Sequence, residues 1–154
     1  MTDLERYLHE QIPLSRAMRV SVVEAGERRV VLSAPLAPNI NHRETVFGGS
    51  AAALATLAAW TLLEVRLSLA GLPARVVIQR SSMDYLRPIA GDFTAKADLT
   101  DDAAWDRFVR TLGRRGKARI ALEAVVEHAG SEAARFAGEF VAVAAPGEPA
   151  RSSA

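Results

Sequence analysis

The segment NINHRETVFGGSAAALATLAAW, residues 39–60, places polar side chains and a Gly-Gly pair directly before a long apolar run. Unpaired backbone N–H groups and a partial positive charge gather at the start of a helix, and glycine lets another group approach that backbone closely. A helix that starts at Gly48 and Gly49 could therefore hold a negatively charged group. The two glycines could instead only bring a tight loop into a crowded helix, and the residues alone leave both interpretations open.

The apolar run predicts a long central helix over residues 50–70, followed by the stop signals Gly71 and Pro73. Nearly every side of this helix is apolar, so we expect protein to surround it. Its longest nearly uncharged part, residues 51–63, is expected to be too short to span a bilayer before Glu64 and Arg66 interrupt it.

The segments on either side indicate what packs around this helix. Thr2 and Glu5 have the spacing of a capping box and start a helix that Pro13 is expected to stop. Alternating and β-branched patterns predict strands over residues 20–24, 30–34, 74–89, 92–100, 117–128 and 134–144. A second amphipathic helix is expected within residues 101–116, closed by Gly113.

This order of elements predicts an α+β fold in which an antiparallel sheet of about five or six strands wraps around the central helix. The length of 154 residues suits one domain, which we place at residues 1–145, and the Pro- and Ser-containing tail 146–154 is expected to be disordered.

Composition excludes several classes of function. The net charge of +1 gives no reason to expect a nucleic-acid or membrane partner. The chain has no cysteine and no signal-peptide pattern, so we expect a cytoplasmic protein without thiolate chemistry. The histidines at positions 9, 42 and 128 lack the spacing of a metal site, and no Gly-x-Ser-x-Gly nucleophile motif is present.

The chain resembles the hotdog-fold acyl thioesterases, most closely the thioesterase domain of the YiiD C-terminal-domain family. The resemblance extends over residues 4–144 and is carried, in order, by YLHEQIPLSRAM, APLAPNINHRETVFGGS, YLRPIAGDF, FVRTLGRRGKARI and FAGEFVAV. It implies hydrolysis of the thioester of an acyl-CoA or an acyl-carrier protein. Coenzyme A or phosphopantetheine would then be part of the substrate, and no separate cofactor is expected.

In related hotdog thioesterases the loop before the helix reads Asn, several residues, then His-Gly-Gly, with an acidic residue two turns into the helix. This chain has Asn41 and both glycines, but Phe47 replaces the histidine and Thr56 stands at the acidic position. The resemblance implies that the Gly48 N–H, together with that of Phe47 or Gly49, holds the oxyanion. Asn41 and Thr56 would position the water. Each has an alternative role, Asn41 in an Asx turn and Thr56 in a bond to the carbonyl one turn back.

Threonine is not a general base near neutral pH, so the base must come from elsewhere. Asp84 could serve across the interface of the dimer that the resemblance implies, with Ser82 or Ser81 positioning the water. Alternatively, Asp84 pairs with Arg80 or Arg87 at the sheet edge. Glu64 is the only carboxylate of the central helix, and it lies too far along to reach Gly48.

Other residues are expected to contact the substrate. His42 could take a proton, or it could simply be solvated. The acyl chain would lie along the central helix near Ala52, Leu57 or Trp60, at a dimer interface. Phe47 is a further candidate for contact with the substrate. The basic loop formed by Arg114, Arg115 and Lys117 could pair with substrate phosphates, or it could be a solvated turn.

We expect a homodimer or a dimer of dimers. The loss of the acidic residue at Thr56 also supports an alternative function, in which the chain binds acyl thioesters without hydrolysing them.

Overall fold

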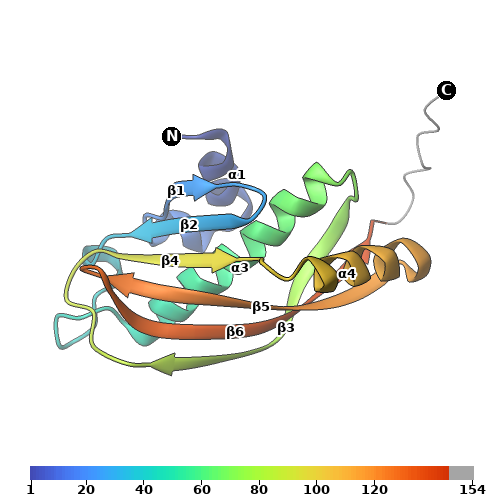
Figure 1. Ribbon diagram of the computed structural model, residues 1–154. Coiled ribbons are helices and arrows are strands. Elements are labelled where there is room, and N and C mark those ends of the chain that lie inside the picture. The colour runs from blue at the N-terminus through green and yellow to red at the C-terminus, as the bar shows by residue number, and fades with distance from the viewer. Residues whose placement is uncertain (146–154) are drawn as a thin grey trace.

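The computed structural model describes residues 1–145, so the predicted tail 146–154 lies outside the described residues. The elements follow one another in the expected order (Figure 1). They are α1 (Asp3–Gln11), α2 (Pro13–Ala17), β1 (Ser21–Ala25), β2 (Arg29–Ala34), η1 (Ala37–Asn39), α3 (Gly48–Leu69), β3 (Ala74–Tyr85), β4 (Phe93–Asp98), α4 (Asp102–Arg115), β5 (Lys117–His128) and β6 (Ser131–Ala144).

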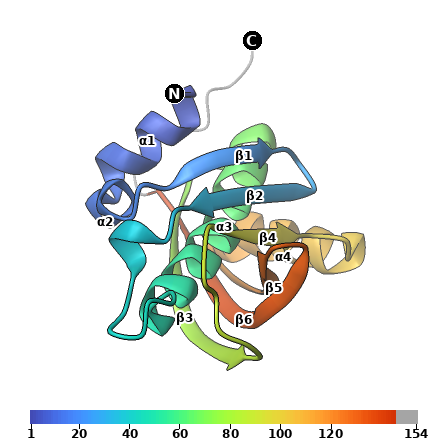
Figure 2. The same cartoon turned by 90° about the vertical axis from the view of Figure 1, so that its left-hand side faces the viewer.

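The six strands form one antiparallel sheet in the order β1-β2-β4-β5-β6-β3. The sheet curves around α3, and Figure 2 shows the helix enclosed by that curve. This is the hotdog fold, and it confirms the predicted fold class. Strand β3 begins directly after α3 and runs back alongside it, so the end of β3 lies close to the beginning of α3, where Tyr85 contacts Gly48.

Alternation of side chains along the strands builds the core. In β5 every second residue from Ala118 to Val126 is buried, and the paired residues of β6, such as Phe136 and Phe140, are buried with them. Paired residues of antiparallel strands point to the same face, so this face packs against Leu54, Ala58, Leu62 and the other buried residues of α3.

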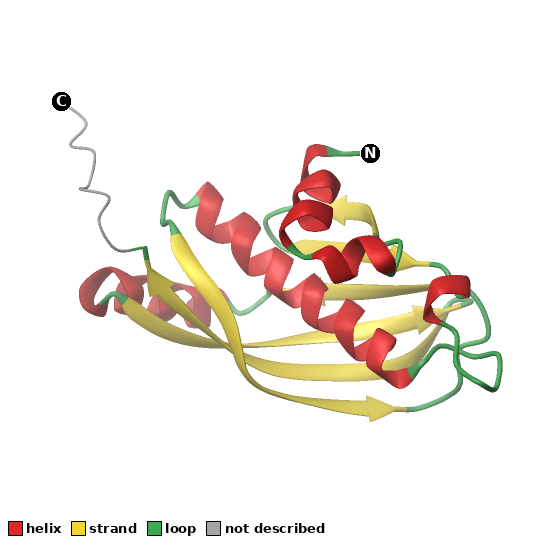
Figure 3. Ribbon diagram, turned by 180° about the vertical axis from the view of Figure 1, so that it is seen from behind, coloured by secondary structure: helices red, strands yellow, loops and turns green. Residues whose placement is uncertain are grey.

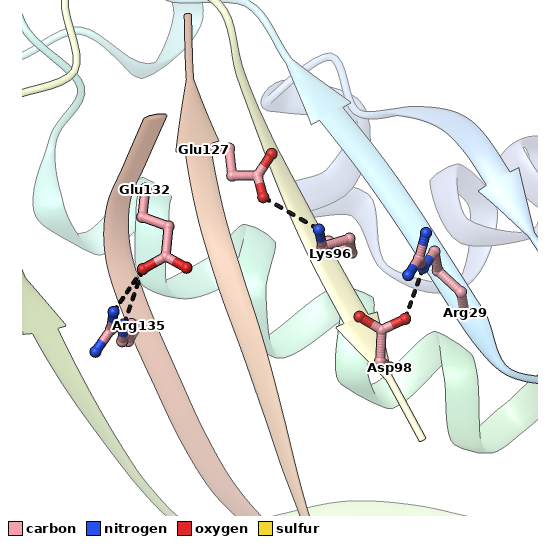
Figure 4. Close-up of polar contacts among 6 residues, drawn as sticks. All are labelled: Arg29, Lys96, Asp98, Glu127, Glu132 and Arg135. Atoms are coloured by element: carbon pink, nitrogen blue, oxygen red, sulfur yellow. Dashed lines mark hydrogen bonds and ion pairs between the residues drawn. The ribbon is translucent and has the colours of Figure 1, made fainter. Parts of the chain in front are cut away.

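The other face of the sheet is largely solvated and carries charged side chains. Figure 4 shows three ion pairs on these strands, Arg29 with Asp98 (2.6 Å), Lys96 with Glu127 (3.2 Å) and Arg135 with Glu132 (2.7 Å). We call this the outer face. Its polarity explains the clean alternation of the strands, because only one face of an antiparallel sheet needs to be buried.

The core position of α3 explains its composition. The helix is long and apolar enough to span a bilayer by length and composition alone, although Glu64 and Arg66 had been expected to make it too short. More than half of its most apolar window, 56%, is buried inside the fold. Burial against the sheet therefore accounts for its hydropathy, as predicted for a helix surrounded by protein.

The structure confirms one predicted helix end, adds a helix and corrects a second end. Helix α1 ends at Gln11, before Pro13, as predicted. Pro13 then begins the unpredicted helix α2, because proline suits the first helical position, where its missing N–H would have no partner. Gly113 lies inside α4, and the cap is Gly116, whose φ of +71° is readily adopted only by glycine. At the N-terminus Thr2 caps α1 as predicted, whereas the Glu5 carboxylate accepts a hydrogen bond from the Val22 N–H instead of completing the capping box.

Candidate functional site at the start of the central helix

Helix α3 begins with unpaired backbone donors. Phe47 is the N-cap residue, and its N–H donates to the carbonyl oxygen of Asn39 (2.8 Å). The N–H groups of Ser50 and Ala51 bond back to the Phe47 carbonyl oxygen. No side chain caps the helix, and within residues 1–145 no partner is found for the N–H groups of Gly48 and Gly49. These two amides can therefore receive an oxygen atom of a ligand.

A cavity of about 360 Å³ lies beside this helix start. Its lining includes Thr45, Val46, Gly48, Tyr85, Arg87 and Ile89. The loop before α3 and the segment after β3 are joined by a hydrogen bond from the Val46 N–H to the Ile89 carbonyl oxygen (2.8 Å). The Tyr85 hydroxyl also donates to the Gly48 carbonyl oxygen (3.2 Å). The cavity thus brings the Tyr85 hydroxyl to the first turn of α3, and Arg87 belongs to the same lining.

Each of the two glycines has a different neighbour. A Cβ atom at Gly48 would meet the Tyr85 ring at 3.5 Å, which is an ordinary van der Waals contact. A Cβ atom at Gly49 would lie only 2.5 Å from Cε1 of Phe47. The Phe47 ring therefore folds back over the first turn of α3, and only glycine at position 49 leaves room for it.

The side chain of Asn41 holds the loop in front of α3. Its Nδ2 donates to Oγ1 of Thr45 (2.9 Å), and its Oδ1 accepts from the N–H groups of Arg43 (2.8 Å) and Thr45 (3.2 Å). This is the Asx-turn alternative for Asn41. Contact of Asn41 with a substrate stays a prediction, as does the role of the exposed His42.

Asn39 connects three parts of the site and was missed in the sequence. It is 2% exposed, and its Nδ2 donates to the carbonyl oxygens of Met18 (3.0 Å) and Pro35 (2.8 Å). Its own carbonyl oxygen receives the Phe47 N–H. Asn39 therefore positions the N-cap of α3 relative to the end of α2. In the sequence it was one of several polar loop residues before the glycines, without a pattern that distinguished it.

Tyr85 and Arg87 were also missed as members of the site. The sequence placed both residues near the end of a strand. No local pattern, however, indicated that this end of the strand lies beside the beginning of α3.

Thr56 and Trp60 lie farther along α3, at a second cavity. The Thr56 hydroxyl donates to the Ala52 carbonyl oxygen one turn back (2.8 Å), and the Trp60 Nε1–H donates to the Val76 carbonyl oxygen (2.9 Å). Together with Leu57, both residues line an apolar cavity of about 270 Å³. Thr56 and Trp60 therefore lie together at the second cavity, one helical turn apart. Neither lies at the free amides of Gly48 and Gly49.

Asp84 and Ser82 lie on the outer face of β3. They pair with Arg135 and Ala137 of β6, both exposed. Tyr85 points the other way and reaches Gly48. Asp84 has no ion-pair partner within 4 Å among the described residues, although its charge contributes to a raised pKa of Arg135, after the larger effect of Glu132. Within one chain, Asp84 and Gly48 thus lie on opposite sides of the sheet.

The basic loop lies at the far end of the molecule. Arg114 and Arg115 end α4, Lys117 begins β5, and all three are exposed. Figure 1 shows α4 at the opposite end of the molecule from the beginning of α3. The 22 residues of α3 span about 33 Å. One chain therefore does not bring this loop to the helix start.

Glu64 is likewise remote from the free amides. It lies 16 residues after Gly48, or about 24 Å along the helix. Burial raises the pKa of Glu64, and burial followed by the Glu64 charge raises the pKa of Tyr7. A further cavity of about 540 Å³, lined by Arg19, Asp92 and His128 among others, contains none of the predicted site residues. No metal-ligating cluster of His, Asp or Glu occurs within the described residues.

Comparison with known proteins extends over nearly the whole chain. A putative thioesterase from Shewanella oneidensis is 29% identical, with a TM-score of 0.81 over 91% of this chain and 94% of that one. The protein OLEI01261 of unknown function from Chlorobaculum tepidum is 26% identical, with a TM-score of 0.88 over 92% and 93%. A mutant of the phenylacetic acid degradation protein PaaI from Thermus thermophilus, 23% identical with a TM-score of 0.63 over 84% and 97%, shares the fold.

A family description adds to this structural similarity. Residues 1–144 match the family described as "Putative thioesterase (yiiD_Cterm)". The match spans all the described elements, from α1 to the end of β6. Together with the hotdog fold, it shows that the chain belongs to the YiiD C-terminal thioesterase family.

Proposed function

We propose that this protein hydrolyses acyl thioesters of coenzyme A or of an acyl-carrier protein, with the thioester carbonyl bound at the start of α3. The observation that carries the proposal is the pair of unpartnered amides at Gly48 and Gly49 beside a cavity of about 360 Å³. Membership of a family described as thioesterases supports this reaction class.

The chemistry follows from the position of the donors. Water adds to the thioester carbonyl carbon, and the oxygen gains negative charge that the two amides and the helix dipole stabilise. Collapse of this intermediate breaks the C–S bond. A thiolate is a good leaving group, since thiols ionise near pH ~8.5, so expulsion needs little help from an acid.

The proton of the attacking water requires a base that α3 does not supply near its first turn. Asn41 would orient the water, as predicted from the resemblance. Thr56 lies about 12 Å along α3 from Gly48, so within one chain it does not reach a water bound there. Tyr85 and Arg87 line the cavity beside Gly48 and are additional candidates for contact with the substrate. Asp84 stays a prediction for a base contributed by a second chain.

Association of two chains through β3 would complete the site. This strand forms one edge of the sheet over 12 residues, and Val77 and Ile78 are exposed on it. An exposed edge strand of this length offers a row of unpaired backbone groups to another strand. Antiparallel pairing of two β3 strands would place the start of one beside the end of the other. It would bring the partner's basic loop nearer to Gly48, where it could meet substrate phosphates.

Replacement of Gly48 tests the oxyanion role sharply. Gly48 is the first helical residue, and Phe47 before it has φ −57° and ψ 132°. Proline is well suited to the first helical position, and the extended backbone of Phe47 is the conformation that a residue before proline prefers. Gly48→Pro therefore removes one N–H with little cost to the helix. Gly48→Ala is the matched control, because it keeps the N–H and its Cβ fits beside Tyr85.

The assay is release of free thiol from acyl-CoA substrates of increasing chain length. We expect about a hundredfold to a thousandfold loss of kcat for Gly48→Pro and near wild-type turnover for Gly48→Ala. Equal turnover of both variants would show that the Gly48 N–H does not stabilise the oxyanion. No thiol release by the folded wild type from any substrate would reject hydrolysis.

A second candidate function, binding without hydrolysis, is favoured by Thr56. Its hydroxyl is engaged with the Ala52 carbonyl oxygen, and no acid occupies this position. This function predicts that acyl-CoA binds without turnover and that Thr56→Asp introduces activity. If the wild type turns over and Thr56→Asp does not increase the rate, the binding-only function is rejected.

A further inference from the structure

The apolar cavity between α2 and α3 has the character of a ligand pocket. Its volume is about 270 Å³, and its lining includes Ile12, Leu14, Met18, Leu57 and Trp60. Figure 3 shows the N-terminal helices beside the middle of α3, on the side of the helix away from the sheet. Concave, mostly apolar sites with a few polar groups are typical of small-molecule binding.

One polar group of this pocket lacks a partner. Ser15 is 1% exposed and lines the pocket, and its Oγ has no hydrogen-bond partner in the part of the chain that the structure describes. A buried hydroxyl without a partner destabilises a fold, so it calls for an explanation. The other hydroxyl of the pocket, Thr56 Oγ1, already donates to Ala52 and retains only acceptor capacity.

One stripe of residues along α3 leads from the start of the helix to the pocket. Gly49, Ala53, Thr56 and Trp60 are spaced by four, three and four residues, so they follow one stripe along the helix. Gly49 is exposed, the other three are half-buried, and the last three line the pocket. A group bound at the Gly49 amide can therefore extend along this stripe into the pocket.

We propose that this pocket receives the acyl chain of the thioester and selects a medium-length chain that carries an oxygen substituent, as in a hydroxyacyl group. This proposal rests on the proposed function. A methylene group is close in size to a water molecule, whose share of liquid volume is about 30 Å³, so the pocket holds about nine such groups at most.

The two polar atoms set the selectivity for an oxygen. Ser15 can donate to a hydroxyl oxygen of the ligand, and that hydroxyl can donate to Thr56 Oγ1. The apolar remainder of the pocket increases affinity about fourfold for each methylene group that it buries, until its volume is filled. A hydroxyl placed against Ser15 adds about a twofold to tenfold gain over the plain chain.

The first test measures binding without any reaction. Calorimetry with straight-chain fatty acids should show affinity that rises from butyrate to octanoate and no longer rises beyond decanoate. Ala53→Phe fills the pocket and should abolish octanoate binding. Ala70→Phe is the matched control, because Ala70 is exposed at the C-terminal cap of the same helix and should leave binding unchanged.

The second test concerns Ser15. Among the positional isomers of hydroxyoctanoate, at least one should bind more tightly than octanoate. Ser15→Ala should remove that advantage, while octanoate itself should bind equally well or better. Leu14→Ser provides a variant that does not threaten folding, because Leu14 is 57% exposed, and it should weaken octanoate several-fold.

The outcomes separate this proposal from the proposed function. Binding that Ala53→Phe abolishes, with no thioester hydrolysed, would support the pocket and reject hydrolysis. Hydrolysis that is indifferent to chain length and to Ala53→Phe and Leu14→Ser would support the reaction and overturn the pocket. A hydroxyl preference that survives Ser15→Ala would overturn the role of Ser15.

Discussion

Replacement of Gly49 by alanine should alter function at the start of α3 with little change in stability. The reason is the Phe47 ring, whose Cε1 would lie 2.5 Å from the new Cβ and whose Cδ1 would lie at 3.1 Å. The ring must turn aside by about an ångström to reach ordinary contact distance. Phe47 is 59% exposed, so solvent leaves room for that movement.

Two opposing effects determine how much Gly49→Ala changes the free energy of unfolding. Alanine is favoured over glycine within a helix by about 0.5–1 kcal/mol. A side chain forced about 30° from its preferred rotamer costs about 0.5–1.5 kcal/mol. The free energy of unfolding should therefore change by less than about 1 kcal/mol for Gly49→Ala alone. In a Phe47→Ala background the ring is absent, so the same substitution should stabilise by the full helical preference of about 0.5–1 kcal/mol.

The assay is a double-mutant cycle by urea denaturation, with acyl-CoA binding and thiol release measured on the same four proteins. We expect a coupling energy of about 1 kcal/mol between positions 47 and 49. Binding should change for Gly49→Ala, because the displaced ring moves beside the free amides. A coupling energy of zero, or an unchanged affinity in every variant, would refute the assignment of the Phe47 ring to this position.

Three further predictions concern one group that supports the site, Asn39, and two buried ionisable groups near the other end of α3. Asn39→Ala should lower the free energy of unfolding by about 1–3 kcal/mol in urea denaturation, because a buried hydrogen bond to Met18 and a part-buried one to Pro35 lose their donor. A change below about 0.5 kcal/mol would contradict this role. Burial raises the folded-state pKa of Glu64 above its unfolded value, so its contribution to stability is fully present at low pH and is lost as pH rises through the folded pKa. Glu64→Gln should therefore raise Tm at pH 7 more than at pH 4. An equal change in Tm at both pH values would reject the raised pKa. The Nε and Nη1 of Arg66 are buried without partners among the described residues, although the guanidinium lies 4.3 Å from the Trp105 ring centroid. In thermal unfolding, Arg66→Met should lower the free energy of unfolding by at most about 1 kcal/mol. A decrease above about 3 kcal/mol would indicate a buried charge pair.

The sequence by itself determined the order and type of the strands and of α1, α3 and α4, whereas α2 and η1 were not predicted. Periodicity decided this, because the apolar stripe of a helix and the alternation of a strand depend on local spacing alone. The 22 residues of α3 and the alternation in β5 were therefore predictable, as was the cap formed by Thr2. The Gly-Gly pair also marked the helix start correctly, since glycine before an apolar run is a local signal.

Only the tertiary structure decided which side chains meet. The hydrogen bond between Tyr85 and Gly48 joins residues 37 positions apart, and it exists because β3 crosses to pair with β6. The face of β3 on which Asp84 lies depends on strand pairing and on a bulge between Ile78 and Arg80. The pocket that α2 and α3 line together, with Ser15 buried and without a partner among the described residues, depends on contacts between segments that no local pattern encodes. Contacts over long sequence separation are set by the packing of the whole chain, and this is why the elements were predictable while the site was only partly so.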